Sequence, residues 1–190
     1  HMDNPYNARL NLSIMMTTNK FKPYQDGLIF HQDKSDKVYF IDNNESNPMM
    51  RFDFGEKWLW TEETLENNPR TSSLIRDTDM IWFVSSYINE RWIYLTYQSS
   101  FEDKFNALID RNSGLHRAVK VNKDAATKYA MTPIKWEEDR FMVSLQSPDV
   151  RAFMDDLGEE KVRFRQGTTL EEIEASENPV LLWLKFKELK

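Results

Sequence analysis

Short apolar runs alternate with polar turns along most of the chain, most clearly between Gly27 and Gly55. Residues 28–30 and 38–41 are apolar runs, Met49, Met50, Phe52 and Phe54 form a third apolar set, and segments rich in aspartate and asparagine separate the three. Strands that recur every ~8–12 residues, with turn residues between them, are typical of antiparallel meanders in sandwiches, barrels and propellers. This stretch therefore predicts three strands of an all-β fold.

The same pattern recurs on both sides of this stretch. Residues 8–17 alternate between apolar and polar positions, which predicts an earlier strand. A second group of strands is predicted over residues 73–76, 80–87, 92–98, 104–110 and 116–121. Asn112, Ser113 and Gly114 mark a hairpin turn in this group, because glycine accepts the positive φ that such turns require. Residues 61–66 predict one short helical turn in the connection between the groups.

A third group of strands begins near residues 131 and 140, and two short helices interrupt it. Ser147 and Pro148 have the order of an N-cap and a first helical residue, and Gly158 follows residues 149–157 as a C-terminal glycine. Thr169 and Glu172 have the spacing of a capping box, which predicts a second helix to about residue 176. Residues 180–186 are apolar and predict a buried closing strand.

Composition is that of a folded domain with a substantial core. The chain has 190 residues, of which 40% are hydrophobic and 13% are aromatic. No Gly/Ser linker or Pro-rich tract divides it, so we expect a single domain over residues 3–190. His1 and Met2 are typical of the remnant of a cleaved tag.

Charge and cysteine content exclude several classes of function. The net charge is −6 and no basic stripe is present, so nucleic acid is not expected as a partner. The absence of cysteine excludes disulfides and thiolate zinc sites. No apolar run reaches the ~18 residues of a membrane span, and no signal-peptide pattern opens the sequence.

The strand groups resemble six-bladed β-propeller proteins that are distantly related to NHL and TolB-like propellers and occur as exported lipoproteins in Bacteroidetes. Residues 21–41, 51–55, 108–114 and 177–187 carry the resemblance. It implies an all-β fold of antiparallel meander blades, about three of them, or half of such a propeller. It also implies a place in the cell envelope with a lipid anchor, and it brings no catalytic motif.

Two histidines are candidate ligand-binding residues. His31 follows an apolar strand and could bind a ligand or metal or act as a base at a blade edge, while the alternative is a structural hydrogen bond. His116 follows the turn at Gly114 and is open to the same two interpretations. Neither has a partner at the spacing of a metal site, so no metal is assigned.

Acidic turn residues give no cofactor site. Asp33, Asp36 and Asp42 resemble a calcium loop in composition, but Ser35 and Lys37 do not fit the EF-hand register. Their expected role is to cap turns. The sequence also has no Gly-rich phosphate loop, G-x-S-x-G elbow or H-E-x-x-H helix, and we expect no cofactor.

Two tryptophans in the polar connection after Gly55 are the remaining candidates. Trp58 and Trp60 have no strand pattern around them, so either could be a loop platform on which a sugar ring or peptide side chain stacks. The alternative is that both cap the core beneath a long loop.

Two functions remain open on sequence grounds. The first is a non-catalytic binding or scaffold module of the bacterial cell envelope that presents propeller loops to a glycan, peptide or protein. The alternative is a propeller enzyme, a polysaccharide lyase or hydrolase, with its site in the central channel. About three blades leave open apolar faces, so we expect either a homodimer or an N-terminal half that completes the ring.

Overall fold

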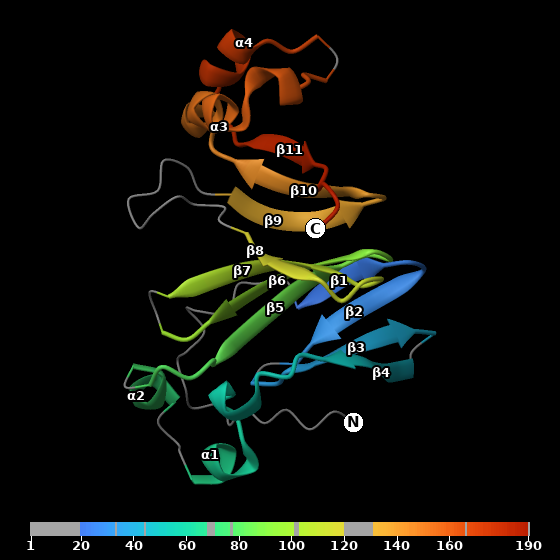
Figure 1. The fold of residues 1–190 in the computed structure, drawn as a ribbon, viewed down its shortest axis with the longest axis vertical. Coiled ribbons are helices and arrows are strands. Elements are labelled where there is room, and N and C mark those ends of the chain that lie inside the picture. The colour runs from blue at the N-terminus through green and yellow to red at the C-terminus, as the bar shows by residue number, and fades with distance from the viewer. Residues whose placement is uncertain are drawn as a thin grey trace.

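A computed structural model of the chain describes residues 20–32, 34–43, 45–67, 71–76, 78–100, 103–119, 131–165 and 167–189. Within these residues, strands β1 to β11 form three antiparallel sheets, with the orders β1-β2-β3-β4, β5-β6-β7-β8 and β11-β10-β9. Figure 1 shows the third sheet stacked beyond the second, with helices at both extremes. The predicted all-β fold of antiparallel meander blades is confirmed. The strand predicted over residues 8–17 lies outside the described residues.

The first sheet follows the predicted meander with two changes. Its strands are β1 Phe21–Tyr24, β2 Gly27–His31, β3 Lys37–Asp42 and β4 Glu45–Arg51. The third strand of the 27–55 stretch was predicted to begin near Met49, but β4 begins at Glu45, because Asp42 pairs with Glu45 across a tight turn. Pro48 is tolerated because β4 is an edge strand, where the missing N–H breaks no ladder bond.

The second sheet contains the most accurately predicted strands. Its strands are β5 Phe83–Ile88, β6 Trp92–Gln98, β7 Lys104–Asp110 and β8 His116–Ala118. The bounds of β6 and β7 are those predicted, whereas β5 starts later and β8 ends earlier. Gly114, with φ +72°, forms the predicted hairpin turn.

The connection between the first two sheets contains short helices. These are the 3-10 turn η1 Gly55–Lys57, α1 Glu62–Asn67 and α2 Thr71–Arg76. The predicted helical turn at 61–66 is confirmed by α1. The strand predicted over residues 73–76 is wrong, because this segment is helix α2. Its apolar pair, Leu74 and Ile75, packs against the core from a helix as well as it would from a strand, and four residues do not show a period.

The third sheet is closed by a strand that returns after a helical excursion. Its strands are β9 Met131–Glu137, β10 Arg140–Leu145 and β11 Val180–Leu184. Between β10 and β11 the chain forms η2 Ser147–Asp149, α3 Val150–Leu157, η3 Glu159–Lys161 and α4 Leu170–Glu174. The closing strand is not fully buried as predicted. It is an edge strand paired only with β10, and Leu181 is 47% exposed.

The two helices near the C-terminus are confirmed, but only one has the predicted cap. The hydroxyl of Thr169 accepts a hydrogen bond from the amide of Glu172, and the Glu172 carboxylate accepts one from the amide of Thr169. Ser147 is not an N-cap. It is buried, and its hydroxyl donates to the carbonyl of Asn178, which ties the start of the helical segment to the approach to β11.

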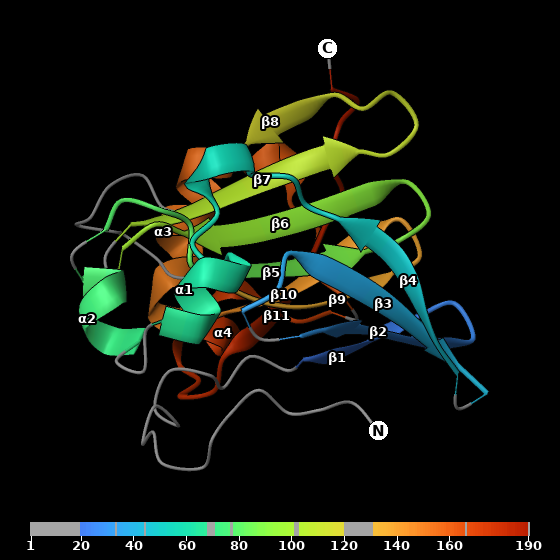
Figure 2. The ribbon, with the colours of Figure 1, turned by 90° about the horizontal axis from the view of Figure 1, so that it is seen from below.

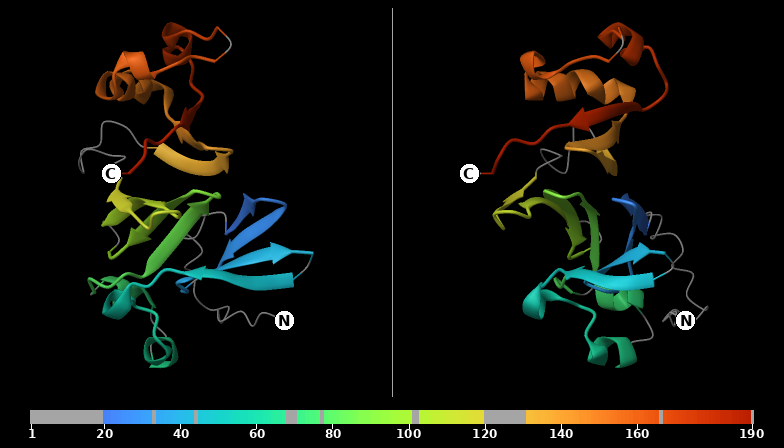
Figure 3. Two further views of the ribbon diagram at one scale, coloured as in Figure 1. Left: turned by 45° about the vertical axis from the view of Figure 1, so that its right-hand side comes forward. Right: turned by 90° about the vertical axis from the view of Figure 1, so that its right-hand side faces the viewer.

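Packing between the sheets supplies the core. Ile29 and Val38 of the first sheet pack with Val84, Ile88 and other residues of the second sheet. A further cluster, formed around Tyr94, Phe141 and Val143, joins the second sheet to the third. Figures 2 and 3 show the consequence, in which the blue and green strands lie side by side and the orange strands lie on the other side of the green sheet. Among the described residues, no helix is long and apolar enough to cross a membrane.

Gly158 ends α3 with positive φ, as predicted, although its φ of 93° and ψ of 124° lie outside the left-handed helical region. We expect Gly158→Val to lower the free energy of unfolding by about 1 kcal/mol or more, because a β-branched residue is strained at this φ. Chemical denaturation measures the loss, and Gly158→Ala is expected to lose less. A Gly158→Val protein with the denaturation curve of the wild type would contradict the assignment.

Candidate functional site

A row of stacked aromatic rings crosses one face of the second sheet. Phe105 and Tyr97 are directly opposite in the β6–β7 register, and their ring centroids lie 5.2 Å apart with an interplanar angle of 18°. Tyr97 then contacts Phe54 at 5.7 Å, and Phe54 stacks on Trp58 at 5.6 Å. We call Phe105, Tyr97, Phe54 and Trp58 the aromatic row.

The two ends of the aromatic row differ in exposure. Trp58 is only 7% exposed, whereas Phe105 is 44% exposed. An exposed ring held flat by a stacked neighbour loses little conformational entropy when a ligand packs on it. Phe105 is therefore the part of the row that is suited to contact a ligand.

The two tryptophans that the sequence offers as a loop platform, Trp58 and Trp60, are buried. Trp58 forms an isolated β-bridge with Ile81, and the indole of Trp60 donates to the carbonyl of Trp82 over 2.6 Å. Both side chains belong to the core between the first two sheets. Their burial agrees with the alternative interpretation, in which they cap the core beneath the long connection.

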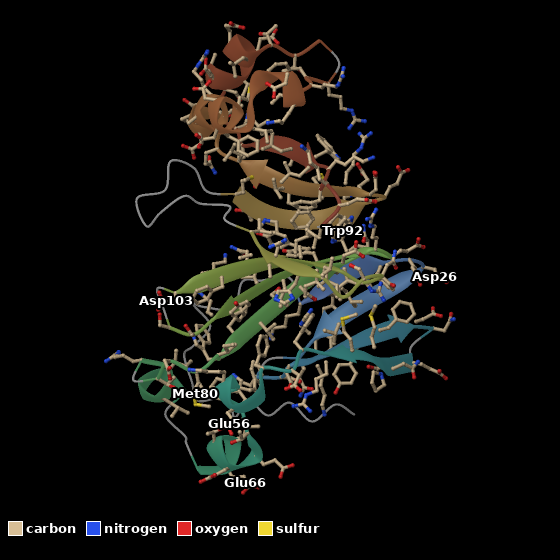
Figure 4. The ribbon with its side chains drawn as sticks, in the orientation of Figure 1. Asp26, Glu56, Glu66, Met80, Trp92 and Asp103 are labelled. Atoms are coloured by element: carbon tan, nitrogen blue, oxygen red, sulfur yellow. The ribbon has the colours of Figure 1, made fainter. Side chains whose placement is uncertain are left out.

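A recess of about 550 Å³ lies beside the exposed end of the aromatic row, between the second sheet and β9. Strand alternation places Lys104 and Asn106 on the face of β7 that looks toward the third sheet, and Arg117, opposite Leu108, is on the same face of β8. Tyr94 and Pro133 form its apolar walls, and Tyr97 and Phe105 border it. Figure 4 labels Asp103 at this end of the sheet and Trp92 near the third sheet.

His116 borders the recess, but its side chain does not lie on the same face of the sheet as Lys104 and Arg117. It is exposed, and because it neighbours Arg117 on the short strand β8, alternation directs the two side chains to opposite faces. The sequence identified His116 as a candidate, but it missed Phe105, Lys104 and Arg117. The available signal was the alternation of Phe105, Ala107 and Ile109, which placed an apolar residue at the exposed start of a strand.

His31, the other predicted histidine, belongs to a buried polar cluster between the first two sheets. Its Nε2 lies 2.7 Å from the hydroxyl of Ser86, and its Nδ1 is buried without a hydrogen-bond partner in the described structure. The ammonium of Lys22 donates to the hydroxyl of Ser85 and to the carbonyl of Ser86, each over 2.7 Å. It also lies 3.8 Å from the centre of the Tyr87 ring.

Burial perturbs both basic groups of this cluster. Burial lowers the pKa of Lys22 to about 7. Burial, together with the charge of Lys22, lowers the pKa of His31 to about 3, so His31 is neutral at physiological pH. A lysine of lowered pKa beside a serine hydroxyl is the arrangement of a candidate nucleophile and base.

Burial argues against chemistry at this cluster. Lys22 is 3% exposed, and Ser85 and Ser86 are buried as well. Burial to this degree leaves a substrate no open route to the hydroxyl of Ser85 in this conformation. The cluster is better explained as a polar contact that fixes β1 and β2 against β5, since each buried donor of this kind favours one arrangement of the sheets.

The acidic turn residues have structural roles where they are described. The Asp36 carboxylate accepts from the guanidinium of Arg51 over 2.6 Å and so joins the start of β3 to the end of β4. Asp42 accepts from the side chain of Asn43, and Asp33 lies outside the described residues. Across the described part of the chain, no group of three His, Asp or Glu side chains could hold a metal ion.

Comparison with known proteins identifies the fold. The model of the family described as "6-bladed beta-propeller" matches residues 2–144. A crystal structure from Bacteroides fragilis, described as a "Putative exported protein", aligns with a TM-score of 0.57 at 18% identity and covers 89% of this chain. The chain spans 49% of that structure. No curated protein matches the chain.

Proposed function

The chain belongs to the family described as 6-bladed β-propeller, and from this premise we propose that it is a non-catalytic glycan-binding module of the bacterial cell envelope. The observation that carries the proposal is the exposed Phe105 at the end of the aromatic row. Flat aromatic rings bind the C–H face of a sugar through dispersion contacts and burial of apolar surface. The exported relative in Bacteroides fragilis supports the envelope location, and the lipid anchor is part of the proposal.

A glycan fits this surface better than an extended peptide. Peptides commonly dock by adding a strand to a sheet edge. The edge beside the recess is β8, which has only the three residues His116–Ala118 and offers a short ladder. A sugar ring needs no such ladder, because it packs on the face of an aromatic ring.

The enzymatic alternative, a polysaccharide lyase or hydrolase, rests on one observation, the contact between Lys22 and Ser85. That contact is buried between sheets, and the described part of the cluster contains no carboxylate to serve as a second acid or base. A binding module therefore accounts for more of the described features than an enzyme does.

Phe105→Ala is expected to weaken glycan binding by about tenfold or more, which corresponds to ~1.4 kcal/mol. A glycan array on the purified chain identifies a binder, and calorimetric titration then compares the variants. Phe21→Ala is the matched control, because Phe21 is also an exposed phenylalanine, 46% exposed, in a cross-strand stacked pair with Phe30.

Three outcomes would contradict the proposal. These are an array without any binder, an equal loss of affinity in the Phe21→Ala and Phe105→Ala variants, and the appearance of new reducing or unsaturated sugar ends during incubation with the bound glycan. The last would indicate turnover, and Ser85→Ala would then test whether the buried cluster is responsible.

Phe21 and Leu28 leave apolar surface exposed on the first sheet. This surface supports the proposed pairing of the chain with further blades, either from a second copy in a homodimer or from an N-terminal half. Nucleic acid is not proposed as a partner, because the net charge is −6.

A further inference from the structure

We propose that residues 8–17 pack as a strand over the outer face of the first sheet, which is the face that points away from the second sheet. The sequence predicts a strand in this segment, which lies outside the described residues. The proposal does not depend on glycan binding, because that function is assigned to the second sheet.

The outer face of the first sheet has the composition of a covered surface. On the inner face, Ile29 and Val38 are 0% exposed and pack against the second sheet. A sheet with one solvated face normally carries polar side chains on that face. Strand register instead gives the outer face two rows that are apolar at every position except Ser46: Phe21, Phe30, Tyr39 and Pro48 in one row, and Pro23, Leu28, Ile41 and Ser46 in the other.

The large apolar side chains of this face are most exposed on β1 and β2. Phe21 is 46% exposed and Leu28 is 40% exposed. Phe21 also stacks on Phe30, with ring centroids 4.9 Å apart, so the two rings present one continuous surface. In Figure 3 the green sheet lies on one side of the first sheet, and no described helix or strand lies over the other side. Contiguous apolar surface of this kind marks an interaction site.

Residues 8–17 have the pattern that this surface requires. Every second residue is apolar, and the residues between them are polar except Met15. As a strand, this segment has one apolar side that can cover the first sheet and one polar side that can face water. The family model matches the chain from residue 2, so the matched propeller region includes the segment. The residues of the apolar side are Ala8, Leu10, Leu12, Ile14 and Met16.

The connection from this segment to β1 has the length that the arrangement needs. The carbonyl of Lys20 accepts a hydrogen bond from the amide of His31 over 3.2 Å, so the ladder between β1 and β2 already includes residue 20. Residues 17 and 20 are separated by three Cα–Cα steps of about 3.8 Å, which reach about 11 Å when extended. Packed sheets lie about 10 Å apart. A strand that ends at residue 17 can therefore lie in the next layer, over β1 and β2.

A hairpin with the free edge of β1 is the competing arrangement. It would give a sheet of five strands, whereas the first and second sheets have four strands each, the usual number in a propeller blade. It would also leave Leu28 uncovered, because Leu28 lies on β2, one strand in from that edge. Covering the face buries more apolar surface. Further strands, from a second copy or an N-terminal half, can then add to the edges of the proposed strand.

Engineered cysteines test the contact without background, because the chain has no cysteine. Leu28→Cys is combined in turn with a cysteine on the apolar side of the segment, and oxidation is followed by peptide mass spectrometry. We expect at least one such pair to form an intramolecular disulfide about tenfold faster than pairs with the polar side, because a disulfide requires Cβ atoms about 4 Å apart. The apolar-side variants are Leu10→Cys, Leu12→Cys and Ile14→Cys, and the matched controls are Asn11→Cys and Ser13→Cys.

A charge placed on the apolar side gives a second readout. Leu12→Asp should lower the melting temperature by several degrees and increase the binding of a hydrophobic dye, because the aspartate cannot pack on the outer face of the first sheet. Ser13→Asp, on the polar side of the same segment, is the control and should change neither.

Three results would overturn the proposal. If Leu28→Cys alone forms a disulfide-linked dimer, a second copy of the chain occupies the face. If both sides of the segment cross-link equally fast, the segment does not lie on the face in one orientation. If no pair cross-links and Leu12→Asp melts like the wild type, the segment does not cover the face. Phe105-dependent glycan binding is measured separately, and none of these results would contradict it.

Discussion

Trp58→Ala is expected to lower the free energy of unfolding by about 3–5 kcal/mol, the usual cost of truncating a large aromatic side chain in a core. Trp58 is 7% exposed and stacks on Phe54 with an interplanar angle of 17°. It also packs in the cluster that joins the first two sheets, so the cavity cannot be closed by moving one loop. For a chain of this size the melting temperature should fall by about 6–20 °C.

Trp183→Ala is the matched control for this prediction. Trp183 lies on the edge strand β11, is only half-buried, and donates its indole N–H to the carboxylate of Glu137 over 2.7 Å. We expect its truncation to cost less, because much of the indole already contacts water. Calorimetric melting of both variants checks the order. A Trp58→Ala protein that melts like the wild type but loses glycan binding would restore the loop platform predicted from the sequence.

The strands were predictable wherever local pattern and turn chemistry agree. β6 and β7 have the predicted bounds because each is an apolar run with polar residues on both sides, and β7 ends at the turn that contains Gly114. The segment at residues 73–76 was predicted wrongly because four residues contain no period, so burial of Ile75 in a helix was indistinguishable from burial in a strand.

The site was harder to predict than the fold, because it depends on which faces of distant strands meet. Trp58 and Trp60 lie in a segment that is polar in sequence, and only the bridge to Ile81 shows that this segment covers the core. Phe105 has the sequence pattern of a core residue, yet it lies at the end of its strand and is 44% exposed. Exposure at strand ends is set by neighbouring sheets, which local sequence does not encode.

The buried polar cluster around Lys22 could not be predicted from local sequence either. Lys22 lies between Phe21 and Pro23, and Ser85 and Ser86 lie within an apolar run. Each is unremarkable in its own segment, because polar residues are common in strands with one solvated face. Only the packing of β1 against β5 makes them partners and removes them from water.

The free energy of unfolding is expected to rise between pH 7 and about 9.5 because of Lys22. Its pKa is lowered from 10.5 to about 7 in the folded chain, so across this interval the unfolded state binds more protons than the folded state. Raising the pH therefore favours folding. Below pH 7 the ammonium is charged in both states and the cost of burying it is constant. Each pKa unit is worth ~1.4 kcal/mol, so the rise should be on the order of several kcal/mol.

Other titrating groups of the cluster act in different pH ranges. The pKa of His31 is lowered from 6.5 to about 3, so its contribution to stability is lost as the pH falls from 6.5 toward 3. Burial raises the pKa of Tyr87, and burial followed by the charge of Tyr87 raises that of Tyr94; both therefore reduce stability only above about pH 10. The interval from pH 7 to 9.5 is thus dominated by Lys22.

Urea denaturation at pH 6, 7, 8 and 9.5 measures this profile. Lys22→Met keeps the length of the side chain without the charge, and we expect its profile to be flat from pH 7 to 9.5. Lys37→Met, at an exposed position on β3, should retain the rise of the wild type. A flat wild-type profile would mean that the ammonium of Lys22 is stabilised in its charged form, and the buried cluster would then have to include an anion or water that neutralises it. A rise that persists in Lys22→Met would assign the pH dependence to another group and would contradict the prediction.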